Sequence, residues 1–333
     1  MVFFNMDADK LIEYIQYGGF VSSQLINLLL LYLLYFQASK NFGRYRVLMI
    51  VFSIFAMIYS LVMMCKGRSL CVCSNGPFTM YRSIGVPLLS IYCGSFGMCI
   101  SLLALHFFYR YIAICKPEKL YYFEGKRIIF TLIPCFVIFV VWSLLVYFFM
   151  DVNEEKERIY HNILMKNYGL DSRKVAFISM LYKSRANGSV EEHWNTHDLI
   201  PFFSTCGIMS VCFNMIIFCG TQSLRQMKNS QIHMSERTKE LNRQLLWTLG
   251  MQTLLPLITM YLPASCFIVL PIFGIELGVG ANKTGAFLGM YPALDPLIAI
   301  LLIKDFRNHV LGRKKASGRV STAASGNKEK SAA

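Results

Sequence analysis

Seven long apolar runs constrain the fold of this chain more than any other feature of its sequence. A helix of about 20 residues crosses the roughly 30 Å hydrocarbon core of a bilayer, where the backbone has to satisfy its own hydrogen bonds. Only 16% of the 333 residues are charged, whereas a soluble domain carries about a quarter. The sequence therefore predicts an all-α membrane protein, a bundle of seven transmembrane helices, with spans at about residues 15–36, 47–65, 85–109, 128–150, 200–220, 245–273 and 285–303.

The charges between the runs predict how the bundle is oriented. An excess of lysine and arginine beside the spans marks the cytoplasmic side. Two glycosylation sequons, at Asn187 and Asn282, also fall in predicted outer loops. We therefore expect the N-terminus outside and the C-terminus in the cytoplasm. In that orientation the cytoplasmic segments hold 3, 5, 5 and 8 lysines and arginines, 21 in all against 12 outside; these segments are 37–46, 110–127, 221–244 and 304–333.

The runs define one membrane domain, residues 1–308, followed by a small polar tail, residues 309–333. The tail cannot bury enough apolar surface to fold, so we expect it to be disordered. The predicted outer loop, residues 151–199, contains no cysteine. Of the eleven cysteines, those placed at an oxidising outer surface are Cys65, Cys71 and Cys73, and the sequence leaves open whether any of them forms a disulfide.

An arginine ends the third apolar run, in the stretch HFFYRYIAICKP. Steps of four and three residues follow one face of a helix. That face leads from Arg110 toward the outer half of the membrane through His106, Leu103, Cys99, Phe96 and Tyr92. An isolated arginine at a helix end is usually an interfacial anchor, so the stripe alone does not define a site.

Polar residues and prolines also lie within the predicted spans. Asp295 costs about 3 kcal/mol near the membrane interior on insertion scales, so it should face the bundle or a wet cavity. Asn27, Asn214 and Gln252 can hydrogen-bond there or act as ordinary contacts between helices. Proline removes a helix hydrogen bond and produces a kink, and the sixth run carries Pro256, Pro263 and Pro271.

Several segments resemble known receptors. YRYIAICKP is similar to the Asp-Arg-Tyr segment that ends the third helix of rhodopsin-like receptors, with Tyr109 in place of the acid. LDPLIAILLIKDFRN resembles their Asn/Asp-Pro-x-x-Tyr segment, with Asp295 and Pro296 in place and Ala299 where the tyrosine would stand. Together with INLLLLYLLYFQASKNFGRYRVLMIVFSIFAMIYS and LNRQLLWTLGMQTLLPLITMYLPA, they resemble the nematode chemoreceptors of the str class. The resemblance runs from the first span to the start of the tail.

This resemblance implies a G-protein-coupled chemosensory, or olfactory, receptor in the plasma membrane, at the cilium of a sensory neuron. A small odorant or other chemical cue would bind in the outer half of the bundle, and a heterotrimeric G protein would bind inside. In such receptors the arginine is held in the inactive state and reaches the G protein in the active one. The rhodopsin-type disulfide cannot form here, because the outer loop 151–199 has no cysteine.

The resemblance and the helix faces together nominate site residues. For ligand binding we expect Tyr92, Phe96, Cys99, Phe203, Cys206, Tyr261 and Tyr291. For coupling and switching we expect Tyr109, Arg110, Tyr111, Pro256, Pro263, Asp295 and Pro296. We expect membrane lipid as a partner, arrestin and kinases at the tail, no nucleic acid, and no cofactor or metal.

Other classes of membrane protein make different demands on the sequence. A ligand-gated channel or a transporter of seven helices is the alternative, but a transporter should show repeats or several intramembrane charges along a path. This chain has one clear intramembrane acid and no repeat. A membrane enzyme needs a catalytic motif such as H-E-x-x-H or G-x-S-x-G, and neither occurs in the sequence. We therefore expect a protein that is not an enzyme.

Overall fold

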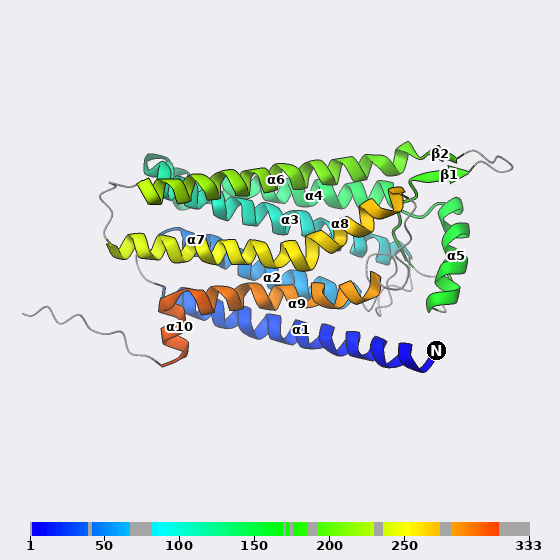
Figure 1. Cartoon of the computed structure of the whole chain (residues 1–333), viewed down its shortest axis with the longest axis horizontal. Coiled ribbons are helices and arrows are strands. Elements are labelled where there is room, and N and C mark those ends of the chain that lie inside the picture. The colour runs from blue at the N-terminus through cyan, green and yellow to red at the C-terminus, as the bar shows by residue number, and fades with distance from the viewer. Residues whose placement is uncertain are drawn as a thin grey trace, which may run out of the picture.

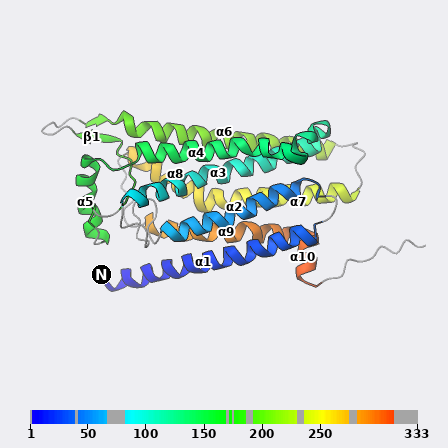
Figure 2. The same cartoon turned by 180° about the vertical axis from the view of Figure 1, so that it is seen from behind.

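The computed structural model is an elongated bundle of helices lying side by side (Figures 1 and 2). It describes residues 2–38, 42–66, 82–168, 171–173, 176–185, 192–229, 236–273 and 281–312. The long helices are α1 (Val2–Phe36), α2 (Tyr45–Lys66), α3 (Arg82–Cys115), α4 (Ile128–Phe149), α6 (Thr196–Asn229), α7 (Glu236–Pro256) and α9 (Ala281–Leu302).

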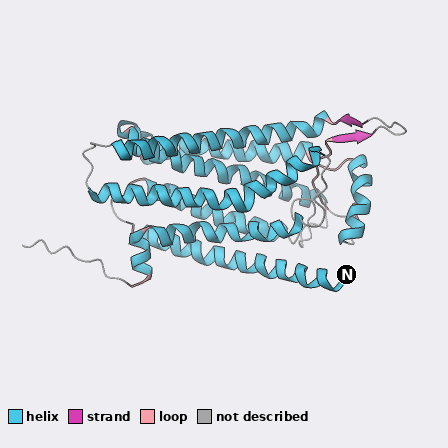
Figure 3. Ribbon diagram, in the orientation of Figure 1, coloured by secondary structure: helices cyan, strands magenta, loops and turns pink. Residues whose placement is uncertain are grey.

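Shorter elements connect and extend these helices. They are η2 (Pro117–Phe123), η3 (Gly125–Arg127), α5 (Glu154–Tyr168), η4 (Leu257–Tyr261), α8 (Leu262–Val269), η5 (Leu270–Phe273) and α10 (Lys304–Val310). A two-stranded antiparallel hairpin joins β1 (Lys183–Arg185) to β2 (Glu192–Trp194), with Ser184 opposite His193. Figure 3 shows this hairpin at one end of an otherwise helical fold.

Within the described residues, six helical stretches are long and apolar enough to cross a membrane. The seventh, α9, contains a shorter apolar stretch, 290–302. The predicted class of fold, an all-α bundle of transmembrane length, is therefore confirmed. We call the end that carries α5 and the hairpin the outer end, and the end that carries α10 the inner end, following the predicted orientation (Figure 1).

Helix α3 forms the centre of the bundle. Its apolar stretch is 72% buried, against 11% for that of α4, and α3 packs against α2, α4, α6 and α7. Glycine allows the close approach of α4, because a Cβ on Gly94 would lie 2.8 Å from the Phe139 carbonyl oxygen and one on Gly97 would lie 2.6 Å from the Trp142 ring. The outward faces of the bundle are apolar, as lipid requires; examples are Phe130, Val211 and Trp247.

A buried asparagine joins three helices. Pro296 has no N–H, so the carbonyl of Pro292 one turn earlier in α9 lacks its usual helical partner. The Asn27 amide nitrogen of α1 donates to that carbonyl at 2.9 Å, and the Ser53 hydroxyl of α2 donates to the Asn27 oxygen at 2.8 Å. Proline in α9 is thus accommodated by an amide from a neighbouring helix.

The sixth span is divided into segments at its prolines. Helix α7 ends at Pro256, and a wider turn, η4, follows, in which the Leu262 amide donates to Leu257 five residues earlier. Helix α8 then begins with Pro263 in its first turn, where a missing N–H is tolerated. The sixth span runs through these segments with a bend: α7 and η4 lie against α9, and α8 diverges from α9 toward the hairpin (Figure 1).

Several expectations concern residues outside this description. Asn187, Cys71, Cys73 and the tail from residue 313 lie outside the described residues. The side chains of Cys65 and Asn282 are likewise not among those described. The disulfide and glycosylation expectations therefore stay predictions.

Candidate functional site

Arg110 lies inside the protein, enclosed by neighbouring side chains. It is 3% exposed, and α3 continues beyond it to Cys115. An anchoring arginine extends its stem along apolar surface and places its charge in water. The guanidinium of Arg110 instead points into the space between α2, α3 and α7, so the anchor interpretation does not fit this geometry.

Two side chains from other helices hold the guanidinium. Its central carbon lies 3.7 Å from the centroid of the Tyr45 ring of α2, a cation–π contact. Its Nη1 donates to the Asn242 amide oxygen of α7 at 3.3 Å. Among the described residues, Nε and Nη2 of Arg110 have no hydrogen-bond partner. The Tyr109 ring of α3 lies further off, with its centroid 5.5 Å from the same carbon. The charge is therefore desolvated and held by aromatic faces and one neutral amide.

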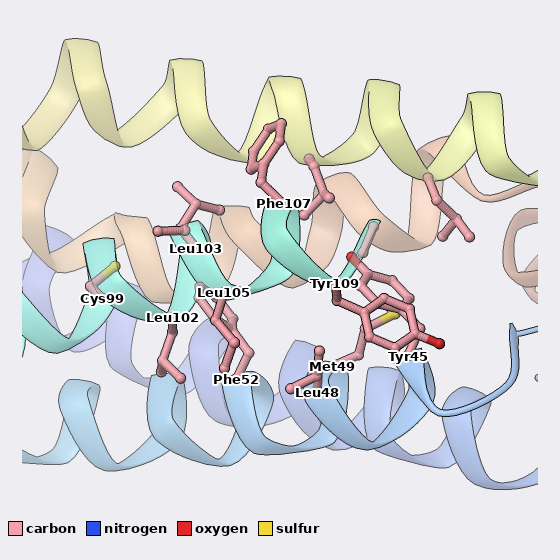
Figure 4. Close-up of a cluster of buried hydrophobic side chains, with 14 of the residues drawn as sticks. Tyr45, Leu48, Met49, Phe52, Cys99, Leu102, Leu103, Leu105, Phe107 and Tyr109 are labelled. Atoms are coloured by element: carbon pink, nitrogen blue, oxygen red, sulfur yellow. The ribbon is translucent and has the colours of Figure 1, made fainter. Parts of the chain in front are cut away.

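The neighbours of Arg110 in the sequence have separate packing roles. The Tyr109 ring packs between a tilted Tyr45 ring, at 5.5 Å, and an edge-on Phe123 ring of η2, at 4.9 Å. Figure 4 shows Tyr109 beside Tyr45. Tyr111 is half-buried and its ring lies 5.8 Å from that of Phe218 in α6. The aromatic residue at position 109 is thus part of the packed interior.

A polar layer lies further toward the middle of the bundle. The Tyr45 hydroxyl and His106 Nδ1 are 3.3 Å apart. Asp295 is 2% exposed, and the Gln252 amide nitrogen of α7 donates to its Oδ2 at 3.0 Å and to its backbone oxygen at 3.1 Å. Asp295 therefore lies within the bundle, as its cost in lipid requires, and joins the sixth span to the seventh.

Five of the seven expected ligand-binding residues come together. They are Tyr92, Phe96, Cys99, Tyr261 and Tyr291. The Tyr92 and Phe96 rings are 5.2 Å apart and perpendicular, the Tyr261 hydroxyl donates to the Phe96 carbonyl at 3.2 Å, and Cys99 Sγ lies 3.1 Å from the Tyr291 hydroxyl. The five residues join α3, the sixth span and α9 into one aromatic cluster.

The other two expected ligand-binding residues do not join this cluster. Phe203 is 66% exposed and faces away from the bundle, and Cys206 is half-buried one turn further along α6. Asn214 is exposed, and its amide bonds within its own helix to Ser210, so it takes no part in the polar layer. A hollow at the outer half of α1 and α2 is lined by Gln16, Phe20, Ser60, Met63 and Met64, and none of the expected ligand-binding residues borders it.

Sequence reasoning missed the two residues that hold Arg110. Tyr45 lies among basic residues in GRYR, and Asn242 lies in the charged stretch KELNRQ. Neither pattern distinguishes an inward-facing side chain from a solvated loop. A weak signal was present in Tyr109, because replacing the acid leaves a buried arginine that requires another partner.

A bundle of helices of membrane length is the architecture of a seven-transmembrane receptor. The family model described as serpentine type 7TM GPCR chemoreceptor Str matches residues 12–311. The chain belongs to this family of serpentine chemoreceptors.

Related receptors align with this chain over most of its length. Serpentine receptor class r-10 of Caenorhabditis elegans is 31% identical over 303 residues, which cover 87% of this chain and 88% of that protein. Its Caenorhabditis briggsae counterpart is 30% identical, with 88% and 87% covered. The G-protein coupled receptor str-33 of Caenorhabditis elegans is 23% identical, with 87% and 86% covered.

Proposed function

We propose that this receptor binds a small chemical cue or odorant in the outer half of its bundle and activates a heterotrimeric G protein at its inner end. The observation that carries the proposal is the buried Arg110, held by Tyr45 and Asn242. Two nitrogens of this permanent charge have no hydrogen-bond partner in the described part of the chain, so the guanidinium has more hydrogen-bonding capacity than its resting contacts use. Exposing it would create a binding site for an acidic or carbonyl-rich surface.

The sixth span supplies the movement that would expose Arg110. Asn242 lies on α7, and Pro256 with the wide turn η4 separates α7 from α8. If α7 swings outward about this break, the Asn242 contact is lost while the Tyr45 contact on α2 can persist. Outward displacement of one helix would then free Nη1 and open the inner end, in agreement with the proposed switching role of Pro256 and Pro263.

The aromatic cluster is the proposed ligand site. Its hydroxyl and thiol groups, on Tyr261, Tyr291 and Cys99, bond to one another or to backbone in this structure. A ligand with one polar group can replace such a bond, and its apolar part can separate the rings. Because Tyr261 and Asn242 both lie on the sixth span, a ligand here would act directly on the span that holds Arg110.

Substitution of Arg110 tests the coupling role. Arg110→Lys keeps the charge but loses the planar fork of five donors, so we expect weaker signalling, and we expect Arg110→Ala nearly to abolish it. The measurement is calcium or cyclic-nucleotide reporter output at matched surface density, after a screen of volatile and water-soluble compounds for an agonist. Equal agonist responses in wild type and both variants would remove the proposal.

Substitution of Phe96 tests the ligand site. Phe96→Ala should change agonist potency or the range of agonists while surface expression stays close to that of wild type. Phe203→Ala is the matched control, because Phe203 is the same residue type on the outer surface of the bundle. A collapse of surface expression in Phe96→Ala would identify Phe96 as core packing and contradict its ligand role.

Location and further partners follow from the proposed activity. A chemosensory receptor would act in the plasma membrane, at the cilium of a sensory neuron, with its basic inner surface beside anionic lipid. Arrestin and kinases are the proposed partners of the tail. Fluorescence imaging of the tagged receptor in sensory neurons tests the ciliary location.

A further inference from the structure

The predicted outer loop crosses the outer end of the bundle as an ordered strap, residues 176–182. The side chains of residues 176–179 are buried. Ile178 packs in a cluster with Leu89 of α3 and with Trp142 and Val146 of α4. The strap is therefore part of the packed protein and not a solvated loop.

A buried lysine fixes the middle of the strap. Lys156 of α5 donates from Nζ to the carbonyl oxygens of Phe149, Asp151 and Ser179 at 3.4, 3.3 and 3.1 Å. The same nitrogen lies 2.9 Å from the Asp198 carboxylate of α6, and both side chains are 1% exposed. Breaking a buried pair by removing one partner is strongly unfavourable, so the pair holds the strap between α5 and α6 without a disulfide.

The next residues of the strap extend this attachment to the sixth span. Asp198 also accepts the Leu181 amide. The Tyr182 hydroxyl then donates to the carbonyl of Ile268 at 2.8 Å, and Met180 Sδ lies 3.0 Å from the same hydroxyl. The carbonyl is the stronger acceptor of the two.

The helix end explains why this carbonyl accepts a side chain. Ile268 lies in the last turn of α8, where carbonyl groups lack helical partners. Pro271, in η5, contributes no N–H. Tyr182 therefore caps the outer end of the sixth span.

The sixth span is consequently held at both ends in one structure. Its inner end is bound through Asn242 to Arg110, and its outer end through Ile268 to Tyr182. Pro256 and the wide turn η4 lie between the two contacts. Ile268 is seven residues beyond Tyr261 of the aromatic cluster, a rise of about 10 Å along the helix.

We propose that Tyr182 is a positioning residue, which holds the sixth span in its resting arrangement until a ligand breaks the bond to Ile268. This inference rests on the proposed receptor function. We call the hydrogen bond from Tyr182 to Ile268 the tether. The tether and the Arg110–Asn242 contact occur in the same conformation. Loss of the tether therefore favours the conformation in which both ends of the sixth span are released.

The tether is insensitive to pH over the physiological range. Burial, with a further contribution from the nearby Cys206 thiol, raises the pKa of the Tyr182 hydroxyl above its ordinary value of about 10. The hydroxyl therefore stays protonated and remains a donor at neutral and mildly alkaline pH.

Tyr182→Phe tests the tether, because it removes the hydroxyl and keeps the ring that packs 5.8 Å from Phe202. Tyr160→Phe is the matched control: the Tyr160 hydroxyl donates to the Met180 carbonyl of the same strap at 3.3 Å. A neutral hydrogen bond of ordinary strength shifts a two-state equilibrium by about fivefold. We expect basal reporter output at matched surface density to rise about fivefold in Tyr182→Phe and to stay near wild type in Tyr160→Phe.

A second measurement does not depend on signalling. Hydrogen exchange of the purified receptor, read by mass spectrometry, should be faster over residues 262–273 in Tyr182→Phe than in wild type or Tyr160→Phe. If exchange over residues 262–273 is unchanged in Tyr182→Phe, or rises equally in Tyr182→Phe and Tyr160→Phe, the bond to Ile268 does not hold the outer end of the sixth span. If exchange is faster in Tyr182→Phe but basal reporter output is unchanged, in a receptor that responds to agonist, the tether does not control the signalling state. If no variant signals, including wild type, while exchange rises only in Tyr182→Phe, the proposed function fails and the tether stands.

Discussion

The contact between Arg110 and Asn242 gives the sharpest prediction about resting activity. Asn242→Ala removes the 3.3 Å hydrogen bond from Nη1 of Arg110 to the sixth span. A hydrogen bond to a charged group contributes about 1.5–3 kcal/mol, and the length of this one favours the lower value. About 1.5 kcal/mol corresponds to roughly a tenfold change in a two-state equilibrium. Asn242→Ala should therefore raise basal G-protein signalling about tenfold, provided that the active state is a minor population.

A second substitution at position 242 should change basal output in the opposite direction. Asn242→Asp has nearly the same shape as the native residue and places a carboxylate against Arg110, where a charge-assisted bond is stronger than one to a neutral amide. We expect lower basal output and a higher agonist concentration for half-maximal response. The two substitutions at position 242 should thus move basal output in opposite directions.

The aromatic contact supplies controls for the same experiment. Tyr45→Phe keeps a ring 3.7 Å from the guanidinium and loses the hydroxyl near His106, so basal output should stay near wild type. Tyr45→Leu removes a cation–π contact that contributes about 2 kcal/mol when desolvated. Because this contact can persist when α7 swings outward, both conformations lose it, and basal output per surface receptor should also stay near wild type. All variants are compared by reporter output per receptor at the cell surface. If Asn242→Ala and Asn242→Asp change basal output in the same direction, or neither changes it, Asn242 does not restrain the receptor.

The remaining predictions concern topology and stability. An N-terminal epitope should be labelled on intact cells and a C-terminal one only after permeabilisation; the reverse pattern would show that the assignment from 21 inner against 12 outer basic residues is wrong. Lys156→Met should lower stability by about 3–5 kcal/mol because it leaves Asp198 buried and unpaired, and the double variant with Asp198→Leu should recover part of the loss; thermal unfolding of purified receptor measures both, and a double variant less stable than the single one would contradict the argument. Gly94→Ala should destabilise the receptor by about 1–3 kcal/mol because its Cβ would lie 2.8 Å from a backbone carbonyl, whereas Gly207→Ala, with nothing within 4 Å, should not; equal melting temperatures would show that α3 and α4 can separate.

The sequence by itself determined the class of fold and the shared helix face of one set of residues in α3. The length of an apolar run and its lack of charge decide whether a segment can span lipid, and neither depends on distant residues. Steps of three and four residues likewise place Tyr92, Phe96, Cys99, His106 and Arg110 on one face of any regular helix. The sequence alone therefore predicted the helices, the kinks at proline and the stripe on α3.

The tertiary structure decided which face of each outer helix meets the bundle. Phe203 was expected at the ligand site and lies on the outer surface. In a membrane helix apolar side chains suit both lipid and the helix interface, so hydropathy does not distinguish the two faces. Helix α3 escapes this ambiguity because neighbouring helices surround it.

Contacts between residues distant in the sequence were also decided only by the tertiary structure. The sequence did not identify the partners of Arg110. The Tyr45 ring and the Asn242 amide hold its guanidinium, and these residues lie 65 residues before and 132 residues after it. Lys156 and Asp198 both lie in a charged outer segment in which the sequence gives no reason to single them out, yet they form a buried pair. A polar residue acquires such a partner only when packing places the two side chains within about 4 Å, because the energy of the contact does not depend on their separation in the chain.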